Sequence, residues 1–114
     1  MSMSEEGQLA GRHCVPCKKG TPSLTKPQYE PLLSQLDDWR VVGGRHLARD
    51  LEFKDFAQAL AFVNRVGELA EAEGHHPDIH LGWGRVGLQI WTHSIGGLSE
   101  SDFVLAAKID RIPR

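Results

Sequence analysis

The chain has 114 residues, of which 40% are hydrophobic and 25% charged, a composition typical of one globular domain rather than a disordered segment. Its 13 basic and 15 acidic residues give a formal net charge of −2 with intermixed signs, which argues against a nucleic-acid-binding surface. No apolar run is long enough to cross a bilayer, and the polar start MSMSEEGQLAGRHC lacks the apolar part of a signal peptide, so we expect a cytoplasmic protein with no membrane partner.

Residues 1–23 are rich in Gly, Pro and Ser, and we expect them to form a loosely attached N-terminal arm ahead of a folded domain over residues 24–114. The arm contains Cys14 and Cys17 in the pattern HCVPC. A Cys-x-x-Cys pair occurs in redox sites and in zinc sites. No apolar strand precedes the pair, and only His13 lies close enough in sequence to be a further ligand, so a solvent-exposed arm is favoured over either role.

The first predicted element is a helix that begins after Thr25. The stretch TKPQ, residues 25–28, is typical of a capping box with proline in the first turn. Leu32, Leu33 and Leu36 then recur at helical spacing. The helix is expected to end near residues 37–38.

A β-hairpin is predicted next. Its strands are WRVV, residues 39–42, and HLARDLEF, residues 46–53. The Gly43-Gly44 pair between them supplies the positive φ angles of a tight primed turn. Alternation along the second strand separates an apolar face from an acidic one: Leu47, Leu51 and Phe53 on the first, Asp50 and Glu52 on the second.

The clearest helix extends from Asp55 to Glu73. Gly74 is a natural residue to end it, and Pro77 lies just beyond. Apolar residues recur every three or four positions and predict one buried stripe along the helix: Phe56, Ala59, Leu60, Val63, Val66 and Ala70.

Two strands and a last helix complete the chain. A short strand is predicted around residues 79–83 and a longer one over residues 85–93, with a glycine-containing turn between them. Ser99 is the expected N-cap of the last helix, and Asp102 is the acidic residue of its first turn. The order helix-strand-strand-helix-strand-strand-helix predicts an α+β fold: a four-stranded antiparallel sheet with three helices packed on one face. The open face and the edges of such a sheet are available for a ligand or for dimerisation.

Four of the six histidines lie within residues 73–97, EGHHPDIHLGWGRVGLQIWTHSIGG. In the strand that ends this stretch, Val86, Leu88 and Ile90 should face the helices, which places Trp91 and His93 on the other side. An imidazole beside an indole suits the floor of a site for a flat heteroaromatic ligand.

His75 and His76 directly follow a helix C-terminus, and Pro77 holds His76 in an extended backbone. Glu71 and Glu73, in the last turn of that helix, are close enough to orient an imidazole. Histidines with a carboxylate suit proton transfer on a substrate that gains or loses water.

Other interpretations stay open for these residues. His75 could serve only to cap the helix. His80 alternates to the other strand face and is expected to be solvated, while Trp39 and Trp83 are expected to pack in the core or at its rim. No metal is predicted, because a strand and turn do not form a rigid ligand set and no further Cys or Glu completes a tetrahedron with the conceivable ligands His76, Asp78, His80 and His93.

These residues resemble the pterin-4a-carbinolamine dehydratase family over about residues 24–112. The shared pattern is a Glu four residues before His-His-Pro, an aromatic residue further on, a Thr-His at the end of the next strand, then Gly-Leu and an Asp opening the last helix. In this sequence the pattern appears as Glu71, His75-His76-Pro77, Trp83, Thr92-His93, Gly97-Leu98 and Asp102. The HCVPC arm resembles the N-termini of bacterial members.

The resemblance implies an enzyme that dehydrates 4a-hydroxytetrahydropterin to the quinonoid dihydropterin, recycling the cofactor of aromatic amino-acid hydroxylases without a metal or organic cofactor of its own. It implies His75, His76 and His93 as catalytic residues, with His75 and His93 as the acid–base pair and His76 orienting the pterin. Substrate-binding residues are implied at Glu71, Pro77, Trp91, Thr92 and Asp102. A homodimer or a dimer of dimers is also implied.

The stretches EGHHPDIHL, IWTHSIGGLSESDF and LAAKID are similar as well to a dehydratase-like branch that is associated with RuBisCO assembly beside α-carboxysome genes. Two functions therefore stay open. An enzyme is favoured because Glu71 and all three histidines are present; the alternative is a catalytically inactive RuBisCO assembly factor. The bulky Trp91 either lines the pterin pocket or fills it.

Overall fold

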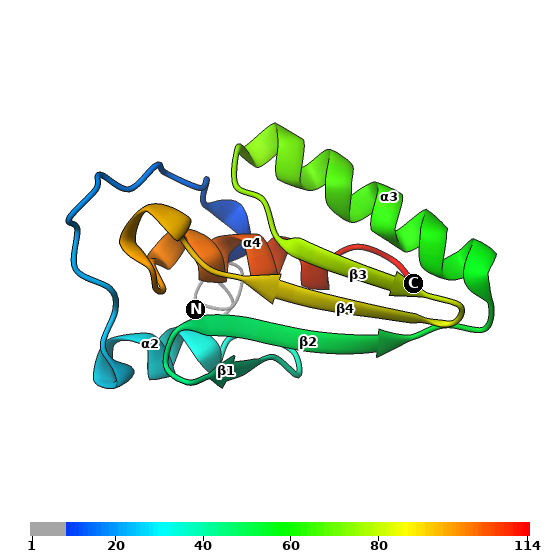
Figure 1. Cartoon of the computed structure of the whole chain (residues 1–114), viewed down its shortest axis with the longest axis horizontal. Coiled ribbons are helices and arrows are strands. Elements are labelled where there is room, and N and C mark those ends of the chain that lie inside the picture. Colours follow the sequence, from blue (N-terminus) through cyan, green and yellow to red (C-terminus); the bar gives the residue numbers. More distant parts are fainter. Residues whose placement is uncertain (1–8) are drawn as a thin grey trace.

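A four-stranded antiparallel sheet runs through the middle of the computed structural model, which describes residues 9–114 (Figure 1). The sheet order is β1-β2-β4-β3, and the strands are β1 (Arg40–Val42), β2 (His46–Glu52), β3 (Asp78–Gly82) and β4 (Arg85–Ile90). The helices are α2 (Lys26–Leu33), α3 (Phe56–Glu73) and α4 (Glu100–Asp110), with a short 3-10 helix, η1 (His93–Ile95). The α+β class and the order of the elements are as predicted.

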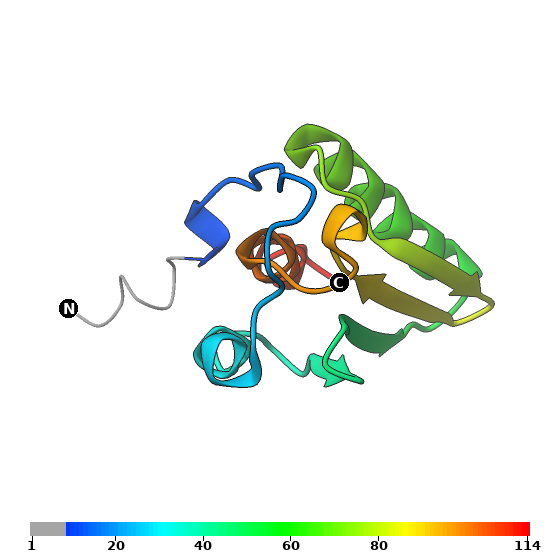
Figure 2. The same ribbon diagram turned by 60° about the vertical axis from the view of Figure 1, so that its left-hand side comes forward.

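The buried face of the sheet is the one that strand alternation predicted. Val86, Leu88 and Ile90 of β4 are at most 1% exposed, and Leu47 and Leu51 of β2 join them in the core. Helix α4 is buried along most of its length and lies at the centre of the molecule in Figure 2, with the other helices and the N-terminal segment around it. Side chains of α4, such as Asp102, therefore have little freedom to move.

The first helix begins as predicted but ends earlier. The capping box is present, with Thr25 N donating to Gln28 Oε1 at 2.8 Å. Helix α2 ends at Leu33, and the chain continues in turns in which Leu36 N bonds to the carbonyl oxygen of Leu33 at 3.0 Å. Asp38 then takes a positive φ of 63°, which no helix tolerates, and the chain turns into β1.

Helix α3 begins and ends as predicted, with Asp55 as N-cap and Gly74 in the left-handed conformation, but its buried stripe is rotated. Phe56 and Leu60 are 43% and 40% exposed, so their predicted burial is wrong. Both stripes satisfy helical spacing, and the sequence alone did not separate them. The stripe that packs on the core is Ala59, Phe62, Val66 and Ala70. No helix within residues 9–114, α3 included, is long and apolar enough to cross a membrane.

Strand β4 stops at Ile90, three residues before the predicted end. Little strand is left for β4 to pair with here. Strand β2 begins at His46, one residue beyond the partner of Ile90, and β3 begins at Asp78, so that Ile90 already lies opposite Pro77, which has no N–H to donate. Thr92 N instead bonds to the Gly97 carbonyl at 2.8 Å. The predicted position of His93 on the open face of the sheet is therefore wrong. His93 lies in η1, at the end of the sheet.

The described part of the N-terminal arm, residues 9–23, packs against the domain (Figure 1, blue). Leu9 is 1% exposed and belongs to the core. Val15 N donates to Ser101 Oγ at 2.7 Å, and Ser101 Oγ donates to the Val15 carbonyl oxygen at 3.0 Å. The expectation of loose attachment is wrong for these residues, because Ser101 of α4 and the buried Leu9 hold the segment to the domain. The expectation of exposure is confirmed for His13, Val15 and Pro16. Residues 1–8 of the arm lie outside the described residues.

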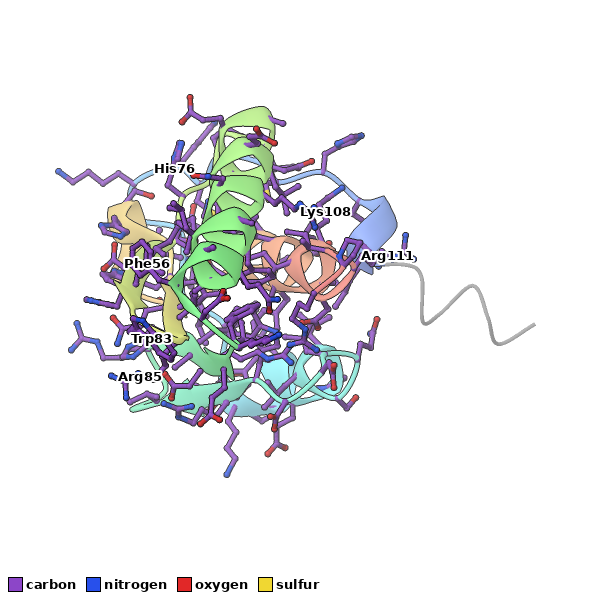
Figure 3. All side chains as sticks on the ribbon, turned by 90° about the vertical axis from the view of Figure 1, so that its right-hand side faces the viewer. Phe56, His76, Trp83, Arg85, Lys108 and Arg111 are labelled. Atoms are coloured by element: carbon purple, nitrogen blue, oxygen red, sulfur yellow. The ribbon has the colours of Figure 1, made fainter. Side chains whose placement is uncertain are left out.

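The two tryptophans expected to pack in the core or at its rim differ. Trp39 is 7% exposed, and its Nε1 donates to Asp110 Oδ1 at 2.8 Å. Trp83 lies in the β3–β4 turn and is 71% exposed. Figure 3 views the molecule from that end, with Trp83 and Phe56 labelled. The core prediction is confirmed for Trp39 only.

Candidate functional site

A pocket opens at the end of the sheet where β3 begins and β4 ends. Its volume is ≈ 420 Å³, which falls within the range of about 300–1,000 Å³ typical of small-molecule sites. Three segments far apart in the sequence line it: residues 74–78 after α3, residues 91–94 at η1, and residues 16–17 of the arm. Figure 1 shows the loop after α3, η1 and the arm gathered at the same end of the molecule.

His75 is held by a buried carboxylate. Its Nε2 lies 2.6 Å from Oδ1 of Asp102, a residue that is 0% exposed. The other oxygen, Oδ2, accepts hydrogen bonds from Thr92 Oγ1 at 2.9 Å and from Ser99 N at 2.8 Å. Since an ionised carboxylate only accepts hydrogen bonds, Asp102 selects a His75 ring that carries hydrogen on Nε2. This leaves Nδ1 as the nitrogen of His75 that Asp102 does not contact.

His76 makes a pair of the same length in a different environment. Its Nε2 lies 2.6 Å from Glu71 Oε2, and the two side chains are 58% and 79% exposed. Exposed pairs of this kind contribute little stability and reorient easily. His76 lines the pocket and Glu71 does not, so the Glu71 carboxylate reaches the pocket only through its contact with His76.

The indole of Trp91 contacts two imidazoles. It stacks on His93 with ring centroids 4.3 Å apart and planes 9° apart, and it meets His46 at 5.8 Å and 53°. Because the pocket beside it is open, Trp91 lines the space and does not fill it. The stack fixes the position of the His93 ring at the pocket wall.

Glu73, the other carboxylate at the end of α3, contacts the arm and not the histidine pair. It accepts a hydrogen bond from Cys14 N at 3.0 Å and lies 3.3 Å from Lys108 Nζ. These contacts, the hydrogen bond from Cys14 first, hold the pKa of Glu73 below its ordinary value. Burial, followed by the Glu73 charge, raises the pKa of the Cys14 thiol to about 12. Cys14 is therefore protonated at neutral pH, which argues against a redox role for it.

Most of the predicted site residues meet at this pocket. Glu71 and Asp102 do not line it, and each contacts one histidine instead. His80 is exposed on β3 and does not line the pocket, as expected of a solvated histidine. The predicted residues that do line it are His75, His76, Pro77, Trp91, Thr92 and His93.

Five residues line the pocket without having been predicted as site residues: Pro16, Cys17, Gly74, Asp78 and Ser94. Ser94 directly follows His93, so its place in the sequence was a usable signal. Ser94 Oγ donates to the Cys17 carbonyl oxygen at 3.3 Å. For Pro16 and Cys17 the sequence offered no such signal, because the contacts of the arm with residues 73–101 depend on the tertiary fold. Across residues 9–114, no three His, Cys, Asp or Glu side chains are grouped so as to hold a metal ion.

Comparisons with known proteins identify the family of the chain. The sequence model described as "Pterin 4 alpha carbinolamine dehydratase" matches residues 22–112. A protein of Rubrobacter xylanophilus is 55% identical over 105 residues, which cover 92% of this chain and 98% of that protein. A protein of Alkaliphilus metalliredigens is 50% identical over 104 residues, covering 90% and 94%. Both carry the name "Putative pterin-4-alpha-carbinolamine dehydratase".

Two solved structures share the fold. The transcriptional coactivator/pterin dehydratase from Brucella melitensis superposes with a TM-score of 0.72 at 35% identity, over 76% of this chain and 94% of that one. A pterin dehydratase-like protein identified as a RuBisCO assembly factor in the α-carboxysome gives a TM-score of 0.56 at 28% identity, over 65% and 87%. With the family match covering most of its length and relatives sharing about half of its residues, the chain belongs to the pterin-4a-carbinolamine dehydratase family.

Proposed function

We propose that this protein is an enzyme that dehydrates a 4a-hydroxytetrahydropterin to the quinonoid dihydropterin. The observation that carries the proposal is the open pocket at which His75, His76 and His93 meet, with His75 tied to the buried Asp102. Membership of the family supports a pterin as the substrate class. We further propose that the protein works as a homodimer or tetramer in the cytoplasm and recycles the pterin of an aromatic amino-acid hydroxylase.

The reaction needs one acid and one base. The bond between C4a and its hydroxyl oxygen breaks, and the oxygen leaves as water after taking up a proton. N5 loses its hydrogen, and the electron pair of that N–H bond completes a double bond between N5 and C4a. Protons are thus moved within one substrate, and positioned imidazoles are suited to both transfers.

His75 is suited to be the base at N5. Asp102 accepts the hydrogen of Nε2, which leaves the lone pair of Nδ1 to take the proton, and the carboxylate stabilises the imidazolium that forms. His93 is suited to be the acid at the hydroxyl group, because it is exposed and regains a proton from water between turnovers. His76, oriented by Glu71, holds the ring of the pterin.

The remaining site residues position these groups. Pro77 and Trp91 offer apolar surface to a flat ring at the pocket wall, and Trp91 also holds His93. Thr92 is 6% exposed, and its hydroxyl group donates to Asp102. We therefore assign Thr92 and Asp102 to the support of His75 and not to direct contact with the pterin.

The test is the decay of the 4a-carbinolamine that a phenylalanine hydroxylase forms, followed by its absorbance. Wild-type protein is expected to speed this decay, and His93→Ala is expected to abolish the effect. His80→Ala, an exposed histidine outside the pocket, is the matched control and should keep full activity. A decay that wild-type protein leaves unchanged would overturn the proposed function.

A second candidate function is supported by the similarity to the RuBisCO assembly factor, at 28% identity and a TM-score of 0.56. Both figures are below those for the Brucella melitensis protein, 35% and 0.72, and the pocket is open, so we favour the enzyme. Co-elution of the protein with RuBisCO subunits in size-exclusion chromatography, together with no effect on carbinolamine decay, would favour the assembly factor.

A further inference from the structure

The N-terminal arm reaches the pocket from outside the region that the family match covers. That match begins at residue 22, yet Pro16 and Cys17 line the pocket together with the three histidines. Figure 2 shows the arm crossing the molecule from the outer side of α4 to α2. The arm therefore adds a wall to a site whose other walls come from the matched region.

The arm is pinned on both sides of this wall. Before it, the Val15 backbone makes two hydrogen bonds with Ser101 Oγ, and Cys14 N donates to Glu73. After it, Ser94 Oγ donates to the Cys17 carbonyl oxygen at 3.3 Å. Ser101 is 6% exposed and lies on the buried helix α4. A segment held to rigid elements in this way keeps its position beside a ligand.

The two cysteines have different surroundings. Cys14 points to α4, where its Sγ lies 3.5 Å from the carbonyl oxygen of Ser101, and it does not line the pocket. Cys17 lines the pocket beside His93 and Ser94. The HCVPC motif thus places the Cys14 thiol against α4 and puts Cys17, three residues further on, in the wall of the pocket.

We propose that the arm is part of the substrate-binding site, with Pro16 and Cys17 in contact with the bound pterin and Ser101 holding them there. This inference rests on the proposed function, since the ligand is taken to be a pterin. It assigns to the arm a role in binding, while the acid–base chemistry stays with His75 and His93.

Protection of Cys17 from alkylation tests the contact. The chain has two cysteines, so Cys14→Ser leaves Cys17 as the one thiol that iodoacetamide can modify. Its modification is followed by mass spectrometry with and without 7,8-dihydrobiopterin, whose binding is measured separately by quenching of tryptophan fluorescence. At a ligand concentration about ten times the Kd, competition for the pocket predicts alkylation about tenfold slower.

The matched control is Cys17→Ser, which leaves Cys14. Alkylation of Cys14 should be unaffected by the dihydropterin, because this thiol does not line the pocket. Binding of the dihydropterin without protection of Cys17, or with equal protection of Cys14, would overturn the inference and leave the proposed function standing. Absence of binding would overturn the inference, whereas the proposed function stands or falls with the carbinolamine decay.

Ser101, which holds the arm through the Val15 backbone, gives a second test, a kinetic one. Ser101→Ala removes both hydrogen bonds to Val15 without adding bulk to the core. A loosened wall should raise KM for the carbinolamine several-fold and leave kcat within a factor of two, since neither histidine contacts Ser101. Ser34→Ala, an exposed serine after α2, is the control. An unchanged KM in Ser101→Ala would contradict the role of the anchor.

Discussion

Two histidine–carboxylate pairs stand side by side at the pocket, with the same Nε2–oxygen distance of 2.6 Å and opposite surroundings. Asp102, the partner of His75, is 0% exposed, whereas Glu71, the partner of His76, has a side chain that is 79% exposed. The buried carboxylate has further donors in Thr92 and Ser99. The two pairs therefore have the same length and differ in the burial of the carboxylate.

The largest difference between the two pairs is expected when each carboxylate is removed. Asp102→Ala leaves three groups without their acceptor, and we expect the free energy of unfolding to fall by about 3–5 kcal/mol. Glu71→Ala removes one exposed pair and should cost less than about 1 kcal/mol. Chemical denaturation of both variants measures the difference. Equal losses would contradict the distinction between a buried and an exposed pair.

Replacing the histidines tests the same distinction in catalysis. His75→Ala and His93→Ala should each lower kcat by about 10²–10⁴-fold, because each removes a proton-transfer group. His76→Ala should act mainly on KM, since we assign it to orienting the pterin. Steady-state kinetics on the carbinolamine separates the two effects. A loss of kcat in His76→Ala as large as in His75→Ala would show that the exposed pair also transfers a proton.

Glu73 is a third carboxylate near the pocket, at the end of α3, and it holds the arm through the Cys14 amide. Its pKa is lowered in the folded protein, so its contribution to stability is present above the ordinary glutamate value of about 4.3 and is lost as the pH falls through the lower folded value. Hydrogen exchange at the Cys14 amide, corrected for its intrinsic pH dependence, should therefore accelerate in acid.

Glu73→Gln is the control for this pH effect. A neutral side chain still accepts the hydrogen bond from Cys14 but no longer titrates, so the acceleration in acid should disappear. If the Cys14 amide keeps its protection down to about pH 3 in the wild-type protein, Glu73 does not anchor the arm through its charge.

The smallest effect is expected at His80. It is exposed, lies on the open face of the sheet and does not line the pocket. His80→Ala should leave kcat unchanged and alter the free energy of unfolding by less than about 0.5 kcal/mol. Kinetics and thermal unfolding check this in parallel. A tenfold loss of activity would show that the open face of the sheet contributes to the site.

The parts of the fold that depend on local sequence were predictable. The capping box at Thr25, the N-cap at Asp55 and the left-handed Gly74 each follow from residues within one turn. The rotation of the buried stripe of α3 was not predictable from local sequence. Phe56 and Phe62 both fit a helical period, and only Phe62 is buried by tertiary packing. The end of β4 at Ile90 depends on where its neighbouring strands stop.

The site was predictable to a similar extent. The residues of the HHP and TH motifs meet at one pocket, as the sequence indicated. The partner of His75 was not predictable from the residues alone, because Asp102 lies 27 residues away and also caps its own helix. The attachment of the arm was not predictable for the same reason: the groups that hold it, Glu73 and Ser101, lie 59 and 86 residues further along the chain than the arm residues they contact.

The central claim is that the buried Asp102–His75 pair carries the base of a dehydratase, with the exposed Glu71–His76 pair in support. The most direct test is the ratio of kcat values for Asp102→Asn and Glu71→Gln in carbinolamine dehydration. We predict that Asp102→Asn loses about a hundredfold or more in kcat while Glu71→Gln stays within about tenfold of the wild-type protein. Equal kcat values in the two variants would contradict the account.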